Sequence, residues 1–298
     1  MLLIMHIPVL QKEVLEFLSP KADENFIDAT IGGGGHAFEI LKHTAPNGKL
    51  LGIDVNLAAI EDLKEKIKNE EIKNRLILIC GNFSNLQNIV RDFNFNSVRG
   101  VLADLGFSSG EIETSGRGFS FLRDEPLDMR YGKNELTAEK IINNWSDQDL
   151  TKIFREYGEE RFADKIAAAI VRDRKTKRIE TTFELVRIIR QSTPYFYHRR
   201  RLHPATKVFQ ALRIAVNDEL NNLNKFLPQV LDVLVSGGRL AIISFHSLED
   251  RIVKNFLKEK KREGLIEILT KKVTRPRHEE IAQNPRARSA KLRAAIKI

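Results

Sequence analysis

The first hundred residues alternate short apolar stretches with longer segments in which apolar residues recur at helical spacing. Such alternation predicts a parallel sheet with helices on both faces, because each parallel connection needs a crossover that packs against the sheet. We expect strands at 25–31, 49–54, 75–79 and 98–105, and helices at 35–45, 56–70 and 84–93. The pattern therefore indicates a doubly wound α/β fold.

The α/β pattern is interrupted between about 106 and 205. A polar, turn-rich stretch is followed there by helical segments near 146–157, 160–173 and 181–192. The pattern then returns with helices near 204–220, 222–235 and 247–262 and a strand at 239–245. We expect a discontinuous sheet domain of 1–110 and 206–298, and an inserted, mainly helical, substrate-binding domain at 111–205. Ligands bind at the carboxyl ends of such strands, so an insertion after the fourth strand would cover the site.

Composition narrows the class of protein. The 298 residues are 42% hydrophobic and 30% charged, which suits a globular chain with a sizeable core. The sequence has no apolar run of about 18 residues and no secretory start, which together point to the cytoplasm. Cys80 is the one cysteine, which excludes an internal disulfide and a cysteine zinc site. The histidines lack ligand spacing, so we expect no metal.

Charge is concentrated in two blocks. The net charge of +9 includes 12 basic and 3 acidic residues in 172–213, and 15 basic and 5 acidic residues in 251–298. Basic blocks of this kind can bind the phosphate backbone of a nucleic acid.

A glycine run follows the first expected strand. Gly32, Gly34 and Ala37 satisfy G-x-G-x-x-A, and Asp54 ends the second strand, where a carboxylate can take ribose hydroxyls. The motif fits pockets for NAD, FAD and S-adenosylmethionine alike. The Walker A pattern is absent, which disfavours phosphoryl transfer.

Two further acids favour a cationic ligand. Asp28 lies near the end of the first strand, four residues before Gly32, and it would repel a dinucleotide pyrophosphate but attract the ammonium and sulfonium of S-adenosylmethionine. Asp104 ends the fourth strand, in a segment similar to the D-P-P-Y loop of amino methyltransferases. Hydrogen bonds from a target amine to such a loop favour the nucleophilic form of the nitrogen. Methylation at a ring carbon is disfavoured, because Cys80 does not lie in a nucleophile loop. His36 and His246 are candidate hydrogen-bond donors.

Beyond these residues, the chain resembles the RsmH (MraW) family of ribosomal RNA methyltransferases. The segments that carry the resemblance span nearly the whole chain: HIPVLQKEVLEFL, TIGGGGH, GRGFSFLRDEPLDMR, RRLHPATKVFQALRIAVNDEL, SFHSLEDRIVK and NPRARSAKLR. The resemblance implies a Rossmann-like S-adenosylmethionine-dependent methyltransferase domain with an inserted helical domain. It also implies methylation of the N4 amine of a cytidine in the decoding region of small-subunit ribosomal RNA.

The resemblance also implies site residues. Cofactor contacts are expected from Gly34, Gly35 and His36 in the glycine loop, together with Asp28, Asp54 at the ribose, Phe83 against the adenine, Asp104 at the methyl-transfer centre and Glu111. The family commonly has Gln or His at position 111, so Glu111 is a departure. Asp104 is the expected catalytic residue, either as a base or as a group that positions the amine.

For the RNA, basic side chains near and within the expected insertion are candidates because arginine pairs with phosphate and stacks on bases. They are Arg117, Arg123, Arg130, Arg199, Arg200, Arg201 and His203, with the C-terminal Arg275, Arg277, Arg286 and Arg288 as further backbone contacts. The expected partner is ribosomal RNA in an assembling or assembled small-subunit particle, and a homodimer is allowed. No membrane partner is expected.

Two other interpretations stay open on the sequence. One is an oxidoreductase that uses a dinucleotide, which Asp28 and Asp104 disfavour. The other is an RNA-binding assembly protein that keeps the fold without catalysis.

Overall fold

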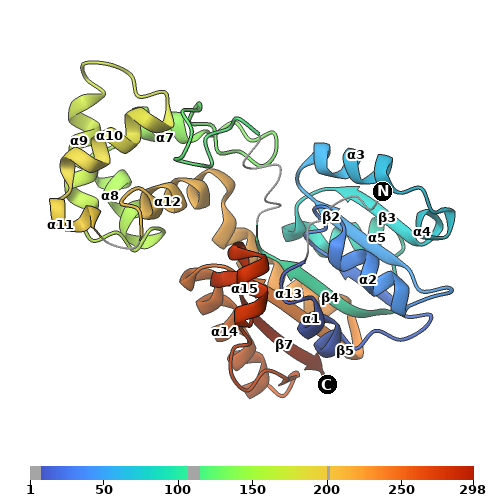
Figure 1. The fold of residues 1–298 in the computed structure, drawn as a ribbon. Helices are drawn as coiled ribbons and strands as arrows, with labels where there is room; N and C mark the ends of the chain where they lie inside the picture. Colours follow the sequence, from blue (N-terminus) through green and yellow to red (C-terminus); the bar gives the residue numbers. More distant parts are fainter. Residues whose placement is uncertain (1–7, 107–114, 200–201) are drawn as a thin grey trace. The chain divides into compact units, whose positions relative to one another are not determined.

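The computed structural model describes residues 8–106, 115–199 and 202–298. The chain divides into two compact units (Figure 1), one formed by 1–108 with 220–298 and the other by 109–219. We call them the sheet unit and the helical unit.

The sheet unit is built on a seven-stranded sheet with the order β3-β2-β1-β4-β5-β7-β6. Its strands are β1 (Asn25–Asp28), β2 (Leu50–Asp54), β3 (Leu76–Cys80), β4 (Val98–Asp104), β5 (Leu234–Ser244), β6 (Ile266–Ile268) and β7 (Lys291–Lys297). The first five are parallel to one another, as the alternation predicts, while β7 is antiparallel to both β5 and β6.

The C-terminal pair β6 and β7 is absent from the sequence-based expectation. The stretch 291–297 carries basic residues at both ends, so it lacks the continuous apolar run by which the parallel strands are recognised. It nevertheless forms β7, which lies between β5 and β6 in the sheet, and its residues Leu292, Ala294 and Ala295 are buried. Arg293 points to Asp250, and its Nε donates to that carboxylate at 2.7 Å.

Helices cover both faces of the sheet. They are α1 (Gln11–Leu18), α2 (Gly35–His43), α3 (Leu57–Lys66), α4 (Glu70–Arg75), α5 (Leu86–Asp92), α13 (Glu219–Val233), α14 (Ser247–Arg262) and α15 (His278–Gln283), with the 3-10 turns η1 (Phe83–Asn85) and η2 (Pro285–Ser289). Successive strand residues alternate between two cores, since Phe26 packs with α1, α2 and α3 while Ile27 packs with α5, α13 and α14. This two-residue alternation explains why both sides of each strand are apolar.

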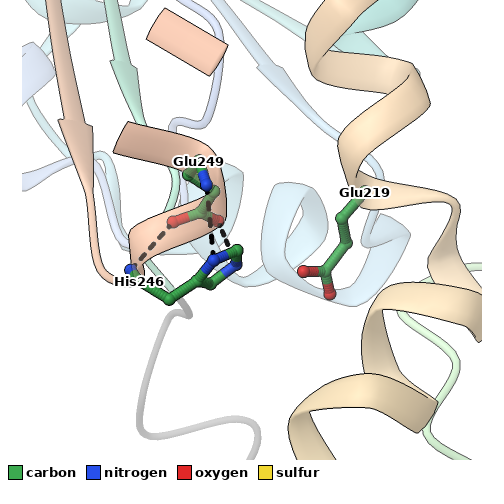
Figure 2. Close-up of side chains that lie close together, drawn as sticks. All are labelled: Glu219, His246 and Glu249. Atoms are coloured by element: carbon green, nitrogen blue, oxygen red, sulfur yellow. Dashed lines mark hydrogen bonds and ion pairs between the residues drawn. The ribbon is translucent and has the colours of Figure 1, made fainter. Parts of the chain in front are cut away.

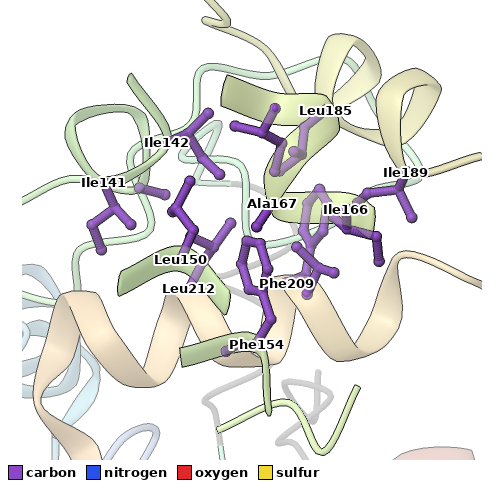
Figure 3. Packing of buried hydrophobic residues seen from close by; sticks show 14 of the residues in the cluster. Ile141, Ile142, Leu150, Phe154, Ile166, Ala167, Leu185, Ile189, Phe209 and Leu212 are labelled. Atoms are coloured by element: carbon purple, nitrogen blue, oxygen red, sulfur yellow. The ribbon is translucent and has the colours of Figure 1, made fainter. Parts of the chain in front are cut away.

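The helical unit has its own hydrophobic core. Its helices are α7 (Ala138–Asn144), α8 (Asp147–Glu156), α9 (Ala163–Asp173), α10 (Thr182–Ser192), α11 (Tyr195–His198) and α12 (Thr206–Asn217). Phe154, Ile166, Phe209 and Leu212 meet in the centre of that core (Figure 3), which places α12 within this unit.

The boundary expected at 205/206 therefore differs from the structure, where the division falls at 219/220. The physical reason is the amphipathic face of α12, whose apolar residues Val208, Phe209 and Leu212 are buried against the helices that precede it rather than against the sheet. Among the described residues, no helix is long and apolar enough to cross a membrane.

Gly100 offers a test of the sheet packing. It pairs with Phe26 across β1 and β4, and a Cβ at this position would lie 2.2 Å from the ring of Phe26, which is 1% exposed. We expect Gly100→Ala to lower the free energy of unfolding by about 1–3 kcal/mol, the usual effect of overpacking a core. Urea unfolding measures this, with Gly81→Ala as the control because its Cβ would make only ordinary contacts. Equal stability of the two variants would contradict the packing.

Candidate active site

Three carboxyl groups lie at the carboxyl edge of the sheet. Asp28, Asp54 and Asp104 are the last residues of β1, β2 and β4. The register aligns Asp28 with Gly52 and Leu102, each two residues before the other acids. Side chains alternate between the two faces along a strand, so each acid points to the same face as the apolar residue two or four positions before it. These apolar residues are Phe26, Leu50 and Leu102, which face α2, so all three acids lie on that face of the sheet.

Thr30 links two of these acids. The Asp28 carboxylate accepts a hydrogen bond from the Thr30 amide at 3.1 Å, and the Thr30 hydroxyl accepts one from the Asp104 amide at 2.7 Å. Sequence reasoning missed Thr30. The signal available was its place two residues before the glycine run, on the loop that leaves β1.

Asp54 fixes the glycine loop. Its Oδ2 accepts from the Gly32 amide at 2.9 Å and its Oδ1 accepts from the Asn56 amide at 2.9 Å. The side chain is only partly buried, and each carboxylate oxygen can accept more than one hydrogen bond. Asp54 can therefore hold the loop while it also accepts a ligand hydroxyl.

The glycine loop leaves room for a ligand. Gly32 and Gly34 adopt φ of 45° and 78°, a region that favours glycine. A Cβ built at Gly33 would meet nothing within 4 Å, so space is open beside the backbone. Gly35 begins α2 directly after the loop, and its N-cap residue, Gly34, has no side chain to cap the first turn.

His36 lies in the first turn of α2 and is 8% exposed. Among the residues that the structure describes, its Nε2 has no hydrogen-bond partner, and it lies 3.8 Å from Oδ2 of Asp104, beyond hydrogen-bond distance. Burial lowers the pKa of His36 to about 4, against a smaller opposing effect of a hydrogen bond with the Val9 backbone. His36 is therefore neutral at physiological pH and presents a ring nitrogen next to a carboxyl group.

Burial is the largest cause of the pKa shifts of Asp28 and Asp104 at the carboxyl edge of the sheet. It raises the pKa of Asp28 to about 7, with the charges of Asp104 and Asp54 adding to the rise and the Thr30 hydrogen bonds opposing it. Burial also raises the pKa of Asp104 to about 7, opposed by the Gly106 amide and assisted by the charge of Glu249. A bound cation would reverse these shifts, because it favours the ionised carboxylates.

Phe83 follows β3, in η1. Its ring lies edge-on to Phe226 with 5.1 Å between centroids, and it is only partly buried. The ring therefore offers a supported apolar surface, which suits the flat face of a purine.

His246 and Glu249 form a capping box at the start of α14 (Figure 2). The His246 Nδ1 accepts from the Glu249 amide at 3.4 Å, and the Glu249 Oε2 accepts from the Phe245 and His246 amides at 2.9 and 3.3 Å. The ring of His246 thus accepts at Nδ1 and caps the helix, while Nε2, the expected donor, lies 3.1 Å from Oε1 of Glu249. Sequence reasoning missed Glu249, although an acid three residues after the cap is a recognised signal.

The expected RNA contacts in the helical unit are dispersed. Arg130 binds Asp128 through two hydrogen bonds of 2.7 and 2.8 Å and donates to the Asn134 carbonyl, so its guanidinium is engaged within the unit. Arg117 is exposed and donates to the Arg130 carbonyl at 3.0 Å. Arg123 is exposed, and its carbonyl accepts from the Thr182 hydroxyl.

His203 stacks on Phe121 with 4.5 Å between ring centroids. Burial and nearby cationic groups lower its pKa. Arg199 is exposed, with its guanidinium 4.8 Å from the ring centroid of Tyr195. In the sheet unit, the four C-terminal arginines are also exposed: Arg275, Arg277, Arg286 and Arg288. Three of the expected site residues, Glu111, Arg200 and Arg201, lie outside the described residues.

The buried acids predict a pH dependence of stability in the cofactor-free protein. The pKa of Asp28 is near 3.8 in the unfolded chain and about 7 in the folded protein, so the stability that Asp28 contributes falls as pH rises between these values and is constant above them. Asp28→Asn removes this loss. We expect urea unfolding to show the stability of the variant, relative to wild type, increasing from about pH 4 to about pH 7.

Asp62→Asn is the control, because Asp62 is an exposed acid on α3 of the same unit. Its stability relative to wild type should not change across this range. A parallel dependence in the two variants would show that Asp28 is not the source.

Known proteins match the chain along its whole length. A protein named ribosomal RNA small subunit methyltransferase H from Persephonella marina is 49% identical over 98% of this chain and 99% of its own. Proteins of the same name from Halothermothrix orenii and Dictyoglomus thermophilum are 46% and 47% identical, covering 98% and 97% of this chain and 98% and 95% of their own. The sequence model of the MraW methylase family matches residues 3–298, so the chain belongs to the MraW methylase family.

Proposed function

We propose that this protein transfers a methyl group from S-adenosylmethionine to the exocyclic N4 amine of a cytidine in the decoding region of small-subunit ribosomal RNA. Its family and its relatives support methylation of ribosomal RNA in general. The observation that carries the finer assignment is the Asp104 carboxyl group. It is partly buried at the end of β4 and lies 3.8 Å from Nε2 of His36, which has no hydrogen-bond partner among the described residues.

The residues at the sheet edge fit this cofactor. S-adenosylmethionine carries an ammonium and a sulfonium, and Asp28 and Asp104 are carboxyl groups whose ionisation such cations would favour. We assign Asp54 to the ribose hydroxyls, Phe83 to the adenine and the backbone of Gly34 and Gly35, with the His36 side chain, to the rest of the cofactor. Glu111 completes the proposed set.

The chemistry requires a proton acceptor as well as a methyl donor. S-adenosylmethionine supplies an electrophilic methyl group, and formation of the nitrogen–carbon bond breaks a sulfur–carbon bond while the amine loses one proton. The cytosine amine is a weak nucleophile because its lone pair is delocalised into the ring. A hydrogen bond from the amine to Asp104 favours the form of the nitrogen that can attack, and stabilises the developing charge.

Asp104 is also suited to receive the proton. Its pKa of about 7 lies close to working pH, where a general base combines an available ionised form with useful basicity. The neutral ring of His36 lies next to Asp104 and can accept a hydrogen bond from the protonated carboxyl group after a small movement.

The two rival functions receive less support. A dinucleotide oxidoreductase conflicts with the methylase family and with acids that would repel a pyrophosphate. An assembly protein without catalysis does not require a desolvated acid at the end of β4. We further propose that the substrate is the RNA within a small-subunit particle in the cytoplasm, with homodimer formation left to measurement. Initial rates on naked RNA and on subunits distinguish the two forms of substrate.

Product analysis tests the proposed reaction. Purified protein, labelled S-adenosylmethionine and small ribosomal subunits should yield label in N4-methylcytidine after digestion to nucleosides. Label in 5-methylcytidine would overturn the assignment, as would no transfer to any ribosomal substrate.

The Asp104→Asn variant keeps the size of the side chain but removes its basicity, so we expect kcat to fall about 100-fold or more. Asp62→Asn should retain the wild-type kcat.

Cofactor affinity should depend on pH in the direction set by the buried acids. Ionised carboxylates attract a cation, so binding of S-adenosylmethionine should tighten as pH rises through about 7. Calorimetric titration across this range measures the effect. Asp28→Asn should weaken binding most above pH 7 and flatten the profile, while an unchanged profile would remove Asp28 from the cofactor site.

A further inference from the structure

We propose that an exposed aromatic and basic surface on the helical unit binds unstacked bases of the substrate RNA. This α11 surface consists of Tyr195, Phe196 and Arg199 on and beside α11, with Arg161 and Lys165 at the start of α9. The inference rests on the proposed function only in taking ribosomal RNA as the ligand.

Buried contacts hold α11 in place. Tyr197 is 5% exposed, and its hydroxyl donates to the buried carboxylate of Glu160 at 2.5 Å. Its ring packs edge-on against Phe162, with 5.0 Å between centroids. His198 is tied to Thr193 through a hydrogen bond of 2.9 Å between Nε2 and the hydroxyl. The side chains on the outer side of this short helix are therefore presented from a fixed backbone.

Two aromatic side chains project from that backbone into solvent. Tyr195 is 69% exposed and Phe196 is 56% exposed, although they are consecutive and each could bury a large apolar area. Single exposed apolar residues are common, whereas adjacent exposed rings on an anchored helix are a feature of binding surfaces. Neither ring is needed for the core of the unit, which forms around other residues.

Cations surround the rings. The Arg199 guanidinium lies 4.8 Å from the Tyr195 ring centroid, and it donates to the Tyr195 hydroxyl at 3.2 Å. Arg161 and Lys165 lie 5.7 and 6.0 Å from the centroid of Phe162, whose ring is 6.3 Å from that of Phe196. Within the described ranges, none of these three cations takes part in an ion pair.

The combination fits single-stranded RNA better than a protein. Such RNA is bound by aromatic side chains that stack on bases and by cations that contact phosphates. The centre of a protein interface, although it is enriched in aromatic residues and arginine, is depleted in lysine. The 12 basic and 3 acidic residues of 172–213 extend the positive charge beyond α11. We therefore assign the α11 surface to unpaired nucleotides of the substrate.

A binding experiment tests the assignment without relying on catalysis. Fluorescence anisotropy measures the affinity of the full chain for a labelled single-stranded fragment of small-subunit ribosomal RNA. The double variant Tyr195→Ala with Phe196→Ala should bind about tenfold more weakly or worse, because stacking on both rings is lost. The exchange variant Tyr195→Phe with Phe196→Tyr keeps both rings and should bind like wild type.

Phe183→Ala is the matched control, since Phe183 is a 48% exposed aromatic on α10 of the same unit. It should leave RNA affinity unchanged. Far-UV circular dichroism and thermal unfolding should be the same in all variants, which shows that each is folded. The charge of the surface is tested separately. Arg161→Gln with Lys165→Gln should reduce the slope of log affinity against log salt by about 2, roughly 1 for each phosphate contact.

Unchanged RNA affinity in the double alanine variant would overturn the proposal. If binding to intact subunits fell while binding to RNA did not, the surface would instead contact a ribosomal protein, which also overturns it. Loss of RNA affinity together with formation of N4-methylcytidine by the wild type supports both inferences. The same loss without that product would refute the proposed reaction alone.

Discussion

The register of one parallel sheet brings Asp28, Asp54 and Asp104 to the same edge and the same face. Each ends a different strand, and the pairings of Asp28 with Gly52 and Leu102 keep the three acids in phase. A shift of one residue in any strand would turn its acid toward the opposite helices, because side chains alternate with a period of two. The packing of Phe26 against its own face of the sheet opposes such a shift, so the core that stabilises the sheet also arranges the site.

The same arrangement has an electrostatic cost. Desolvation raises the pKa values of Asp28 and Asp104, the charges of Asp104 and Asp54 add to the rise at Asp28 and that of Glu249 adds to it at Asp104, and the hydrogen bonds from Thr30 and Gly106 offset this only in part. Desolvated acids of this kind are costly to stability unless they are paired. The proposed cationic ligand would offset that cost, because it would favour their ionised forms. The neutral His36 beside Asp104 adds a hydrogen-bonding group without adding charge that would compete with the ligand.

The surface of the helical unit differs from the edge of the sheet, because it carries basic side chains rather than acids. Its core is formed by side chains from α7 to α12, and its surface carries cations beside exposed rings. The hydrogen bond between Tyr197 and Glu160 holds α11 in place. This limits the entropy that Tyr195 and Phe196 would lose when a base stacks on them. Arg130 shows that positive charge alone does not identify an RNA contact, because Asp128 binds its guanidinium within the unit.

The sequence by itself determined the parallel part of the sheet, the glycine loop, the three acids at the strand ends and the family. These features are local, since each depends on the spacing of residues within one strand, turn or helix. Only the tertiary structure placed β7 beside β5, buried α12 in the helical unit, connected Thr30 to Asp104 and left Nε2 of His36 without a partner. Those outcomes depend on contacts between segments far apart in the chain, and such contacts decide which polar groups are paired and which surfaces are buried.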